Sequence, residues 1–325
     1  MKAIMFRRYG GPEQLEPREV PKPVPGDNEL LIRVHASSVN SWDWEFLNGT
    51  PFVNRLMFGL LRPRPEKRVL GADIAGTVEA IGRHVTRFRA GDAVFGDLWD
   101  HWGGFAEYAC ARETAMEPKP EHITFEQAAA VPQAGVLALQ GIRKAGQLCR
   151  GQKVLINGAG GGVGTFAIQL ARLAGAEVTG VDALHKLDVV RALGADHVMD
   201  YAVEDFTKTG ERYDLIIDCQ NFRSMYDNRR ALTPDGVYAM IGGSIPRVYQ
   251  LWLLSMLAPL ERDTRKLCLV AEGPNKGLAE LRELIEAGKV APVIDRTYRL
   301  EEVPEAFRYF GEGRHKGKIV IAIQS

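Results

Sequence analysis

The sequence predicts an α/β protein that combines a doubly wound parallel sheet with a smaller β-rich domain of the barrel type. Three observations support this fold class. Residues 1 to about 125 hold short apolar runs between turn residues, and residues 126–273 alternate strand patterns with helical patterns. A glycine-rich turn joins the first of these later strands to the helix that follows it.

The β-rich part contains three clear strand patterns, at residues 30–36, 71–82 and 91–96. Four prolines precede or flank them and keep residues 17–25 extended, because proline fixes its backbone angle and has no N–H to donate to a helix. Short strands between turn residues are typical of a small barrel-like domain.

The alternating part contains six strand patterns. Strands that alternate with helices are typical of a doubly wound parallel sheet. The strands are expected at residues 154–157, 177–181, 197–200, 213–218, 236–241 and 267–270. In the tail that follows, we expect a helix at 276–287, a short helix near 304–310 and a last strand at 318–323, with the tail rejoining the first domain. The predicted domains are therefore 1–125 with 274–325, and 126–273.

The glycine-rich turn is the strongest functional signal in the sequence. An apolar strand pattern ends in Asn157, a run of glycines follows, and the run opens a helical pattern. Glycines allow a tight turn and a close approach, and the N–H groups of the helix N-terminus attract a diphosphate. The chain returns through a second strand that ends in Asp182. An acidic side chain at that position accepts from ribose hydroxyls and repels a 2′-phosphate, which favours NAD.

Composition and charge exclude several classes of function. The 325 residues include 41 basic and 41 acidic side chains, so the chain has no net field to attract nucleic acid or an anionic membrane. Four widely spaced cysteines favour reduced thiols and a cytoplasmic protein. The apolar stretch at 248–260 is shorter than the ~20 residues of a spanning helix, so it is interpreted as a buried or interfacial helix.

Six motifs give the chain a specific resemblance, in the order and spacing of residues 71–76, 103–108, 158–164, 194–201, 229–236 and 313–318. With these motifs the chain resembles the medium-chain dehydrogenase/reductase superfamily, and within it the zinc-independent quinone oxidoreductase branch. The resemblance covers nearly the whole chain. It implies a GroES-like domain completed by the C-terminal tail, with a Rossmann domain inserted, and hydride transfer to a small hydrophobic quinone or α,β-unsaturated carbonyl.

The resemblance also bears on metal binding. Zinc enzymes of this superfamily hold the catalytic metal with cysteine, histidine and cysteine, whereas the matching positions here are Asn40, Ala72 and about Ala134. Zinc needs three protein donors, so no metal is expected. The stretch that matches the structural zinc loop has only Cys110.

The cofactor expectation follows from the resemblance. NADPH is the usual donor in this branch, and the 2′-phosphate contacts fall near His185, Lys186 and Tyr201. NADPH is therefore expected, and NADH remains the alternative because of Asp182. The candidate cofactor-binding residues are Ala159, Gly160, Gly161, Gly162, Val163, Gly164, Asp182, Lys186, Tyr201, Gly242 and Lys318.

The acceptor side is less defined by the sequence. The resemblance places Asn40 and Trp44, the candidate catalytic residues, toward the nicotinamide; the alternative for Asn40 is that its amide fixes the loop after the strand. The apolar segments 51–61 and 251–257 are hypothesised to wall a hydrophobic acceptor site, with a subunit interface of a homodimer as the alternative. Two other functions stay open: a metal-free NAD(P)-dependent alcohol or carbonyl dehydrogenase, and a dinucleotide-binding protein with little turnover.

Overall fold

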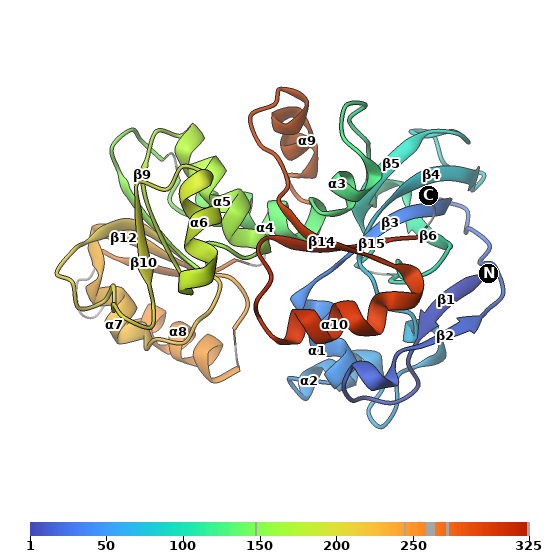
Figure 1. Cartoon of the computed structure of the whole chain (residues 1–325), viewed down its shortest axis with the longest axis horizontal. Helices are drawn as coiled ribbons and strands as arrows, with labels where there is room; N and C mark the ends of the chain where they lie inside the picture. Colours follow the sequence, from blue (N-terminus) through green and yellow to red (C-terminus); the bar gives the residue numbers. More distant parts are fainter. Residues whose placement is uncertain (100, 147, 244, 258–263, 271–272, 324–325) are drawn as a thin grey trace. The chain divides into compact units, whose positions relative to one another are not determined.

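Figure 1 shows the computed structural model of the chain, which describes residues 1–99, 101–146, 148–243, 245–257, 264–270 and 273–323. The chain divides into two units. The first comprises residues 1–133, 274–286 and 292–325, and the second comprises residues 134–273 and 287–291. Each unit has its own sheet, and each is described by itself.

The second unit is built on a six-stranded sheet with the order β10-β9-β8-β11-β12-β13, and every neighbouring pair is parallel. Leu155, Ile156 and Ile216 are fully buried, as expected for strands covered on both faces. This confirms the predicted doubly wound sheet. The strands are β8 (Lys153–Asn157), β9 (Glu177–Asp182), β10 (His197–Asp200), β11 (Tyr213–Asp218), β12 (Leu232–Met240) and β13 (Lys266–Leu269).

Helices follow the strands in this unit. They are α4 (Pro132–Arg143), which begins at the end of the first unit, α5 (Gly162–Leu173), α6 (Leu187–Ala192), α7 (Met225–Arg230) and α8 (Ile245–Leu257). Residues 248–257 of the segment predicted as a buried or interfacial helix belong to α8, and residues 258–260 lie outside the described residues. Helix α8 buries Leu251 and Leu254, while Trp252 and Met256 are more than half exposed. No helix in the described part of the chain has the length and hydrophobicity needed to span a bilayer.

The first unit is dominated by β-structure. Its main sheet has the order β14-β15-β3-β4-β5-β7, with β6 also paired to β3, and β1 pairs separately with β2. The eleven-residue β3 is the centre of the sheet, since it pairs with β4, β6 and β15. The strands are β1 (Lys2–Met5), β2 (Glu16–Glu19), β3 (Glu29–Val39), β4 (Asp73–Ile81), β5 (Ala93–Asp97), β6 (Tyr108–Arg112), β7 (Met116–Pro118), β14 (Ile294–Arg299) and β15 (Lys318–Ala322).

The C-terminal strand completes this sheet, because β15 lies between β14 and β3 with Val320 opposite Ser38. Helix α10 packs against β14, β15 and β3 (Figure 1). The helices of the unit are α1 (Ser41–Asn48), α2 (Val53–Phe58), α3 (Phe125–Ala129), α9 (Leu278–Glu286) and α10 (Val303–Gly311).

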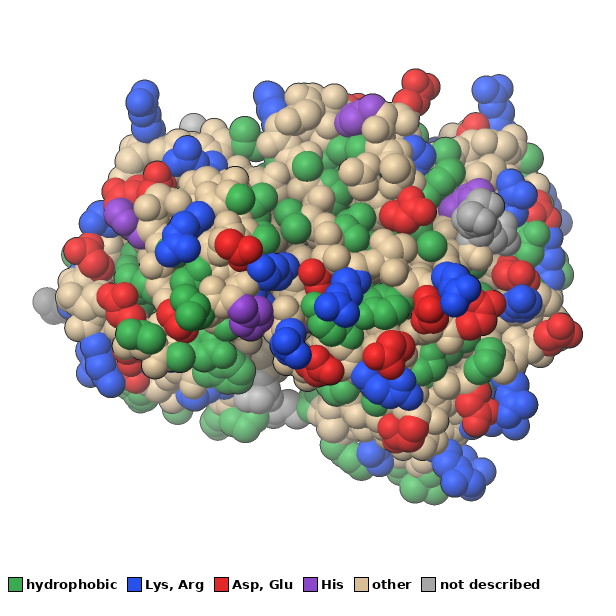
Figure 2. Space-filling model, viewed as in Figure 1, with side chains coloured by type: hydrophobic (Ala, Val, Ile, Leu, Met, Phe, Trp, Pro, Cys, Tyr) green, Lys and Arg blue, Asp and Glu red, His purple; other side chains and the backbone are tan. Residues whose placement is uncertain are grey.

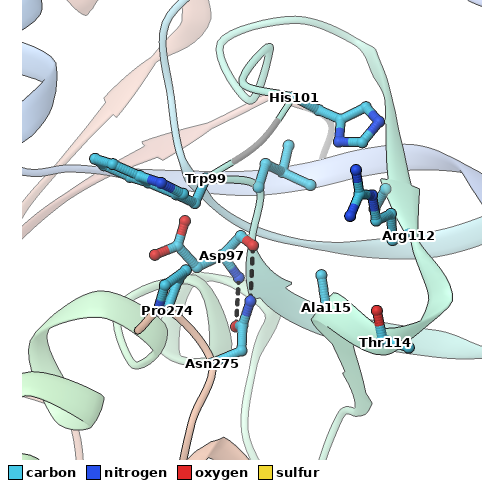
Figure 3. A pocket seen from close by; sticks show the side chains of 10 residues that line it. Asp97, Trp99, His101, Arg112, Thr114, Ala115, Pro274 and Asn275 are labelled. Atoms are coloured by element: carbon cyan, nitrogen blue, oxygen red, sulfur yellow. Dashed lines mark hydrogen bonds between the residues drawn. The ribbon is translucent and has the colours of Figure 1, made fainter. Parts of the chain in front are cut away.

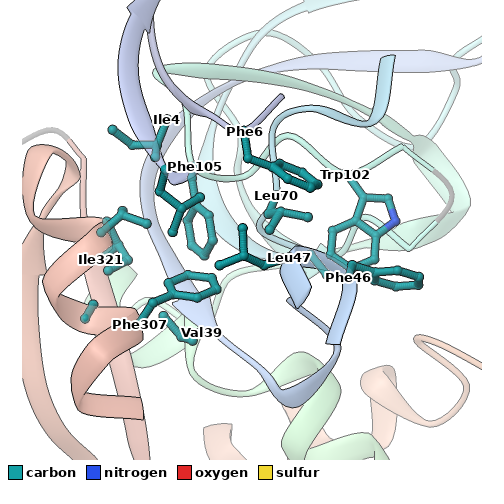
Figure 4. Packing of buried hydrophobic residues seen from close by; sticks show 14 of the residues in the cluster. Ile4, Phe6, Val39, Phe46, Leu47, Leu70, Trp102, Phe105, Phe307 and Ile321 are labelled. Carbon is teal, nitrogen blue, oxygen red and sulfur yellow. The ribbon is translucent and has the colours of Figure 1, made fainter. Parts of the chain in front are cut away.

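An aromatic core fixes α1 and α2 to the sheet. Figure 4 shows side chains from the N-terminal strand, α1 and α10 meeting in this core. Phe46 stacks on Phe58 with ring centroids 3.7 Å apart and meets Trp102 edge-on at 4.8 Å. Such aromatic pairs contribute beyond their buried area. The core therefore holds the start of α1, and with it Asn40, in a defined position.

Candidate functional site

The glycine-rich turn lies between β8 and α5, as the sequence predicts. Gly158 has a left-handed backbone (φ 87°), and its N–H donates to the Val181 carbonyl of β9 at 2.9 Å. A Cβ on Gly164 would lie 2.2 Å from the Gly158 carbonyl oxygen, so only glycine permits this close packing of helix on strand. The first N–H groups of α5 have no partner within the helix and form an anion-binding edge.

Asp182 at the end of β9 is bonded to this turn. Its Oδ2 accepts from the Gly160 N–H at 2.8 Å, and its Oδ1 accepts from the Ala183 N–H at 2.8 Å. Lys186 Nζ lies 3.9 Å from Oδ1, and both side chains are 7% exposed. The sequence suggested that Asp182 reaches the ribose, whereas in the structure its carboxylate closes the turn beside Lys186.

Tyr201 and Gly242 lie at the same carboxyl edge of the sheet. Asp200 pairs with Asp182 in the register of β10 and β9, and the Tyr201 N–H donates to the Asp182 carbonyl at 3.3 Å. Tyr201 is exposed, so its ring is available to a ligand. Gly242 follows β12 with a left-handed backbone (φ 69°). In doubly wound sheets ligands bind at this edge.

A buried network at this edge was missed by the sequence analysis. Asp218 Oδ1 accepts from Asn157 Nδ2 at 2.8 Å and from the Asn221 N–H at 2.9 Å, and its Oδ2 accepts from the Tyr238 hydroxyl at 2.8 Å. Asp218 and Tyr238 are fully buried. Burial and the neighbouring Asp218 carboxylate raise the pKa of Tyr238. The available signal was a polar residue at the ends of β8 and β11, where apolar runs stop.

The first unit contains a second buried polar cluster, formed by Asn40, Asp73 and Lys318. Asn40 Nδ2 donates to Asp73 Oδ2 at 3.0 Å, and Lys318 Nζ donates to Asn40 Oδ1. Lys318 Nζ also lies 3.5 Å from Asp73 Oδ2. Ser38 and the Gln133 N–H complete the partners of Asp73. A buried charge is tolerated when it is paired and hydrogen-bonded in this way.

Two further acids lie near this cluster. Asp43 accepts from the Asn40 N–H and the Gly71 N–H, both at 2.9 Å, while burial raises its pKa to about 7. Burial, followed by the Asp73 and Asp43 carboxylates, raises the pKa of Asp97 well above its ordinary value. Burial lowers the pKa of Lys318. Burial thus opposes charge on each of these groups, while the contact between Asp73 and Lys318 acts in the opposite direction and favours the charged form of both.

The candidate catalytic residues have partners of their own. Both polar atoms of the Asn40 carboxamide are engaged by Asp73 and Lys318. Trp44 packs on α10, with its ring centroid 6.5 Å from that of Phe307, and a Cβ on Gly311 would lie 2.5 Å from the Trp44 ring. Fixing the loop after β3 is thus one observed role of Asn40, and a role for either residue toward an acceptor stays a prediction.

The residues at the zinc positions do not fit a zinc ion. Asn40 is bonded within the cluster, and Ala72 and Ala134 offer no donor side chain. Within the described ranges, no group of three or more His, Cys, Asp or Glu side chains is arranged to hold a metal ion.

A small pocket of about 150 Å³ lies beside Asp97 in the first unit. Figure 3 shows the Asn275 amide bonded to the backbone of Asp97, with distances of 2.9 Å to its N–H and 2.8 Å to its carbonyl. The Asp97 carboxylate points toward Trp99, away from Arg112 (Figure 3).

The two apolar segments present large side chains to solvent. In residues 51–61, Phe52 and Leu56 are 62% and 60% exposed. In α8, Tyr249 and Trp252 are 62% and 52% exposed, with ring centroids 5.7 Å apart. Both sets are therefore available for contact with another apolar group. The hypothesis of an acceptor wall stays a prediction.

Comparisons with known proteins agree with this architecture. Residues 26–121 match the family described as alcohol dehydrogenase GroES-like domain, and residues 193–321 match the family described as zinc-binding dehydrogenase. The chain is 31% identical to a chloroplast envelope quinone oxidoreductase homolog of Arabidopsis thaliana, over 99% of this chain and 98% of that protein. It is 33% identical to the mitochondrial NAD(P)H oxidoreductase RTN4IP1 of Mus musculus, over 91% and 82%. The structure of the quinone oxidoreductase from Coxiella burnetii superimposes with a TM-score of 0.88 at 30% identity, over 100% and 99% of the two chains.

Proposed function

Because the chain belongs to the quinone oxidoreductase-like branch of the medium-chain dehydrogenase/reductase superfamily, we propose that it reduces a quinone or an α,β-unsaturated carbonyl with a reduced nicotinamide cofactor. The observation that carries the proposal is the glycine turn of β8 and α5 in a chain whose full-length relatives are named quinone and NAD(P)H oxidoreductases.

NADPH is the proposed donor, with NADH as the alternative. The N–H groups at the start of α5 would hold the diphosphate. The small residues of the loop from Ala159 to Gly164 would let the diphosphate approach the backbone closely. Lys186 and Tyr201 stand at the edge where a 2′-phosphate would bind, and Asp182 would oppose it. The cofactor supplies the hydride when it is bound.

The chain's own residues supply position and electrostatics. A conjugated acceptor gathers negative charge on its oxygen as the hydride arrives, and a fixed hydrogen-bond donor stabilises that oxygen. We propose the second N–H of the Asn40 carboxamide for this role, with Trp44 nearby, since one N–H is taken by Asp73. Lys318 stabilises the orientation of the amide through Asn40 Oδ1, and it is the proposed cofactor contact of the first unit. A metal is not needed for this chemistry.

The acceptor is proposed to be hydrophobic. The exposed aromatic and aliphatic side chains of 251–257 and 51–61 support this, because large apolar side chains on a surface mark a place that another apolar group covers. We also propose a homodimer formed through β13, which is one of the two edge strands of its sheet. A cytoplasmic location is proposed from the four free cysteines.

The test is the loss of reduced-nicotinamide absorbance by EDTA-treated protein, with NADPH and NADH in parallel against a small quinone, an enone and a simple aldehyde. Turnover of the quinone or enone that survives EDTA is the expected result. Turnover with the aldehyde alone, or loss of activity with EDTA, would point to a dehydrogenase instead. NADPH binding without turnover of any acceptor would favour a binding protein.

A further inference from the structure

The segment around α2 carries an outward-facing apolar surface. Its apolar side chains are largely exposed, from 45% for Val53 to 85% for Leu61. Phe52 and Leu56 are four residues apart at α2 and therefore share one side of the helix, while Leu60 and Leu61 follow after the helix has ended at Phe58. We call these side chains, with the exposed Arg7, Arg8, Arg62 and Arg64, the α2 face. Its apolar members are Phe52, Val53, Leu56, Leu60 and Leu61.

The α2 face is fixed from beneath. Phe58 is 2% exposed and stacks on Phe46 of α1. The Tyr9 hydroxyl donates to the Gly59 carbonyl at 2.5 Å, and Arg55 Nε donates to the Gly49 carbonyl at 3.1 Å. The exposed side chains are therefore held outward by a segment that is already packed on its inner side, and they cannot all be buried by a small local shift.

Basic side chains are concentrated around these apolar ones. Residues 51–68 contain five basic residues and one acid, Glu66, although the whole chain is neutral. Arg62 and Arg64 are exposed. Arg7 and Arg8 are brought to the same place, because the Phe6 N–H donates to the Arg68 carbonyl at 2.9 Å and Tyr9 bonds Gly59. Figure 2 shows hydrophobic and basic side chains next to one another at the lower edge of the view, where Figure 1 draws α2.

We propose that the α2 face docks the protein on the surface of an anionic lipid bilayer. Aliphatic and aromatic side chains enter the boundary between headgroups and acyl chains, while arginines next to them bind the negative headgroups. A second copy of this chain fits the face less well, since a two-fold interface would bring the arginines of both copies together. This docking goes beyond the proposed reaction. It is an alternative to the acceptor wall as the role of the apolar side chains of residues 51–61, and the test below separates the two.

The test is co-sedimentation of the full-length protein with vesicles. Vesicles of phosphatidylcholine with about one third phosphatidylglycerol should bind the protein, and pure phosphatidylcholine should bind it much less. Binding to the anionic vesicles should weaken as salt rises from about 0.05 M to about 0.5 M, because exposed charges are screened. The double variant R62E/R64E should lose binding at least about tenfold.

Matched control variants distinguish vesicle binding by the α2 face from a general effect of surface charge or polarity. R212E/K289E makes the same change in net charge at exposed positions elsewhere and should bind like the wild type. L56S/L61S should weaken binding, whereas V24S/V203S, at positions that are both 86% exposed, should not. The rate of NADPH oxidation by R62E/R64E with a water-soluble quinone tests the proposed reaction independently of vesicle binding.

Four results would overturn the proposal. The first is equal sedimentation with neutral and anionic vesicles, and the second is equal binding by R62E/R64E and R212E/K289E. The third is a change of oligomeric state in L56S/L61S with unchanged vesicle binding, which would assign the face to a second copy. The fourth is a raised KM for a soluble quinone in L56S/L61S with unchanged vesicle binding, which would assign the face to the acceptor.

Discussion

Lys318 of β15 and Asp73 of β4 form a buried ion pair, with Nζ 3.5 Å from Oδ2 and side chains that are 3% and 0% exposed. Asn40 lies against both, since its Nδ2 donates to Asp73 and its Oδ1 accepts from Lys318. The C-terminal strand is thereby tied to the start of α1, where the acceptor is proposed to bind. The arrangement makes the charge of Lys318 a structural requirement as well as a candidate cofactor contact.

Replacement of Lys318 should destabilise the fold. K318M leaves the buried Asp73 carboxylate without its cation, and breaking a buried pair in this way costs about 3–5 kcal/mol. The free energy of unfolding in urea should fall by that order, and D73N/K318M should recover part of it because no lone charge remains. A loss below about 1 kcal/mol in K318M would show that the pair is not coupled to folding.

Stability should fall as pH rises from about 4 to about 7. Asp43 keeps its proton in the folded state up to a pKa of about 7, while the unfolded chain releases it near 3.8, so the folded state binds the extra proton between these values. The raised pKa of Asp97 acts in the same direction, whereas the lowered pKa of Lys318 adds stability only as pH rises toward 10.5. The charged groups that interact with Asp43 are Asp73, Asp97 and Lys318.

The measurement is the unfolding free energy at several pH values for wild type and D43N. D43N removes the titrating group and should flatten the slope between pH about 4 and 7, whatever its effect on the absolute stability. D92N serves as the control, because the Asp92 carboxylate is not part of the buried cluster. An identical slope in wild type and D43N would contradict the assignment.

Asp182 and Lys186 should set the choice between NADPH and NADH. K186M should lower kcat/KM for NADPH about tenfold and leave NADH nearly unchanged, because only the 2′-phosphate uses the ammonium. D182N should raise the NADPH-to-NADH ratio by removing the opposing charge, while keeping an oxygen for the Gly160 N–H. K208M, at a lysine whose side chain is 78% exposed, should change neither. An unchanged ratio in both variants would mean that selectivity lies elsewhere.

Asp218 should matter more than Tyr238 for the turn that holds the cofactor. D218A removes a carboxylate that accepts from Asn157, Asn221 and Tyr238. It leaves the Asn157 amide and the Asn221 N–H buried without this acceptor, while the Tyr238 hydroxyl keeps Asn221 Oδ1 at 3.3 Å, and we expect a cost of about 3 kcal/mol or more. Y238F removes one of these bonds and should cost about 1 kcal/mol. Urea unfolding measures both, and the Kd for NADPH should rise more in D218A. Equal losses in the two variants would contradict a shared network centred on Asp218.

The predicted strands of the parallel sheet are found in the structure because their signals are local. Runs such as residues 154–156 are apolar on both faces, and this pattern is typical of a covered parallel sheet wherever the strand lies in the order. The sequence also predicted the positions of Gly158 and Gly164 in the turn, because a left-handed backbone and a close backbone approach both require glycine. Strand ends were predicted less accurately. Strand β12 begins at Leu232, four residues before the predicted start, because Leu232 pairs with Tyr213 of β11 ahead of an irregularity in the register.

By itself the sequence determined the two kinds of sheet, the glycine turn and the absence of donors at Ala72 and Ala134, because each depends on residues close together in the chain. Only the tertiary structure decided what the polar residues contact. Lys318 reaches Asn40 across 278 positions of sequence, and Asp182 turns toward Gly160 rather than outward. Packing brought these groups together. A buried polar or charged group requires a hydrogen-bonding or ion-pair partner, and no local sequence pattern specifies which residue that partner is.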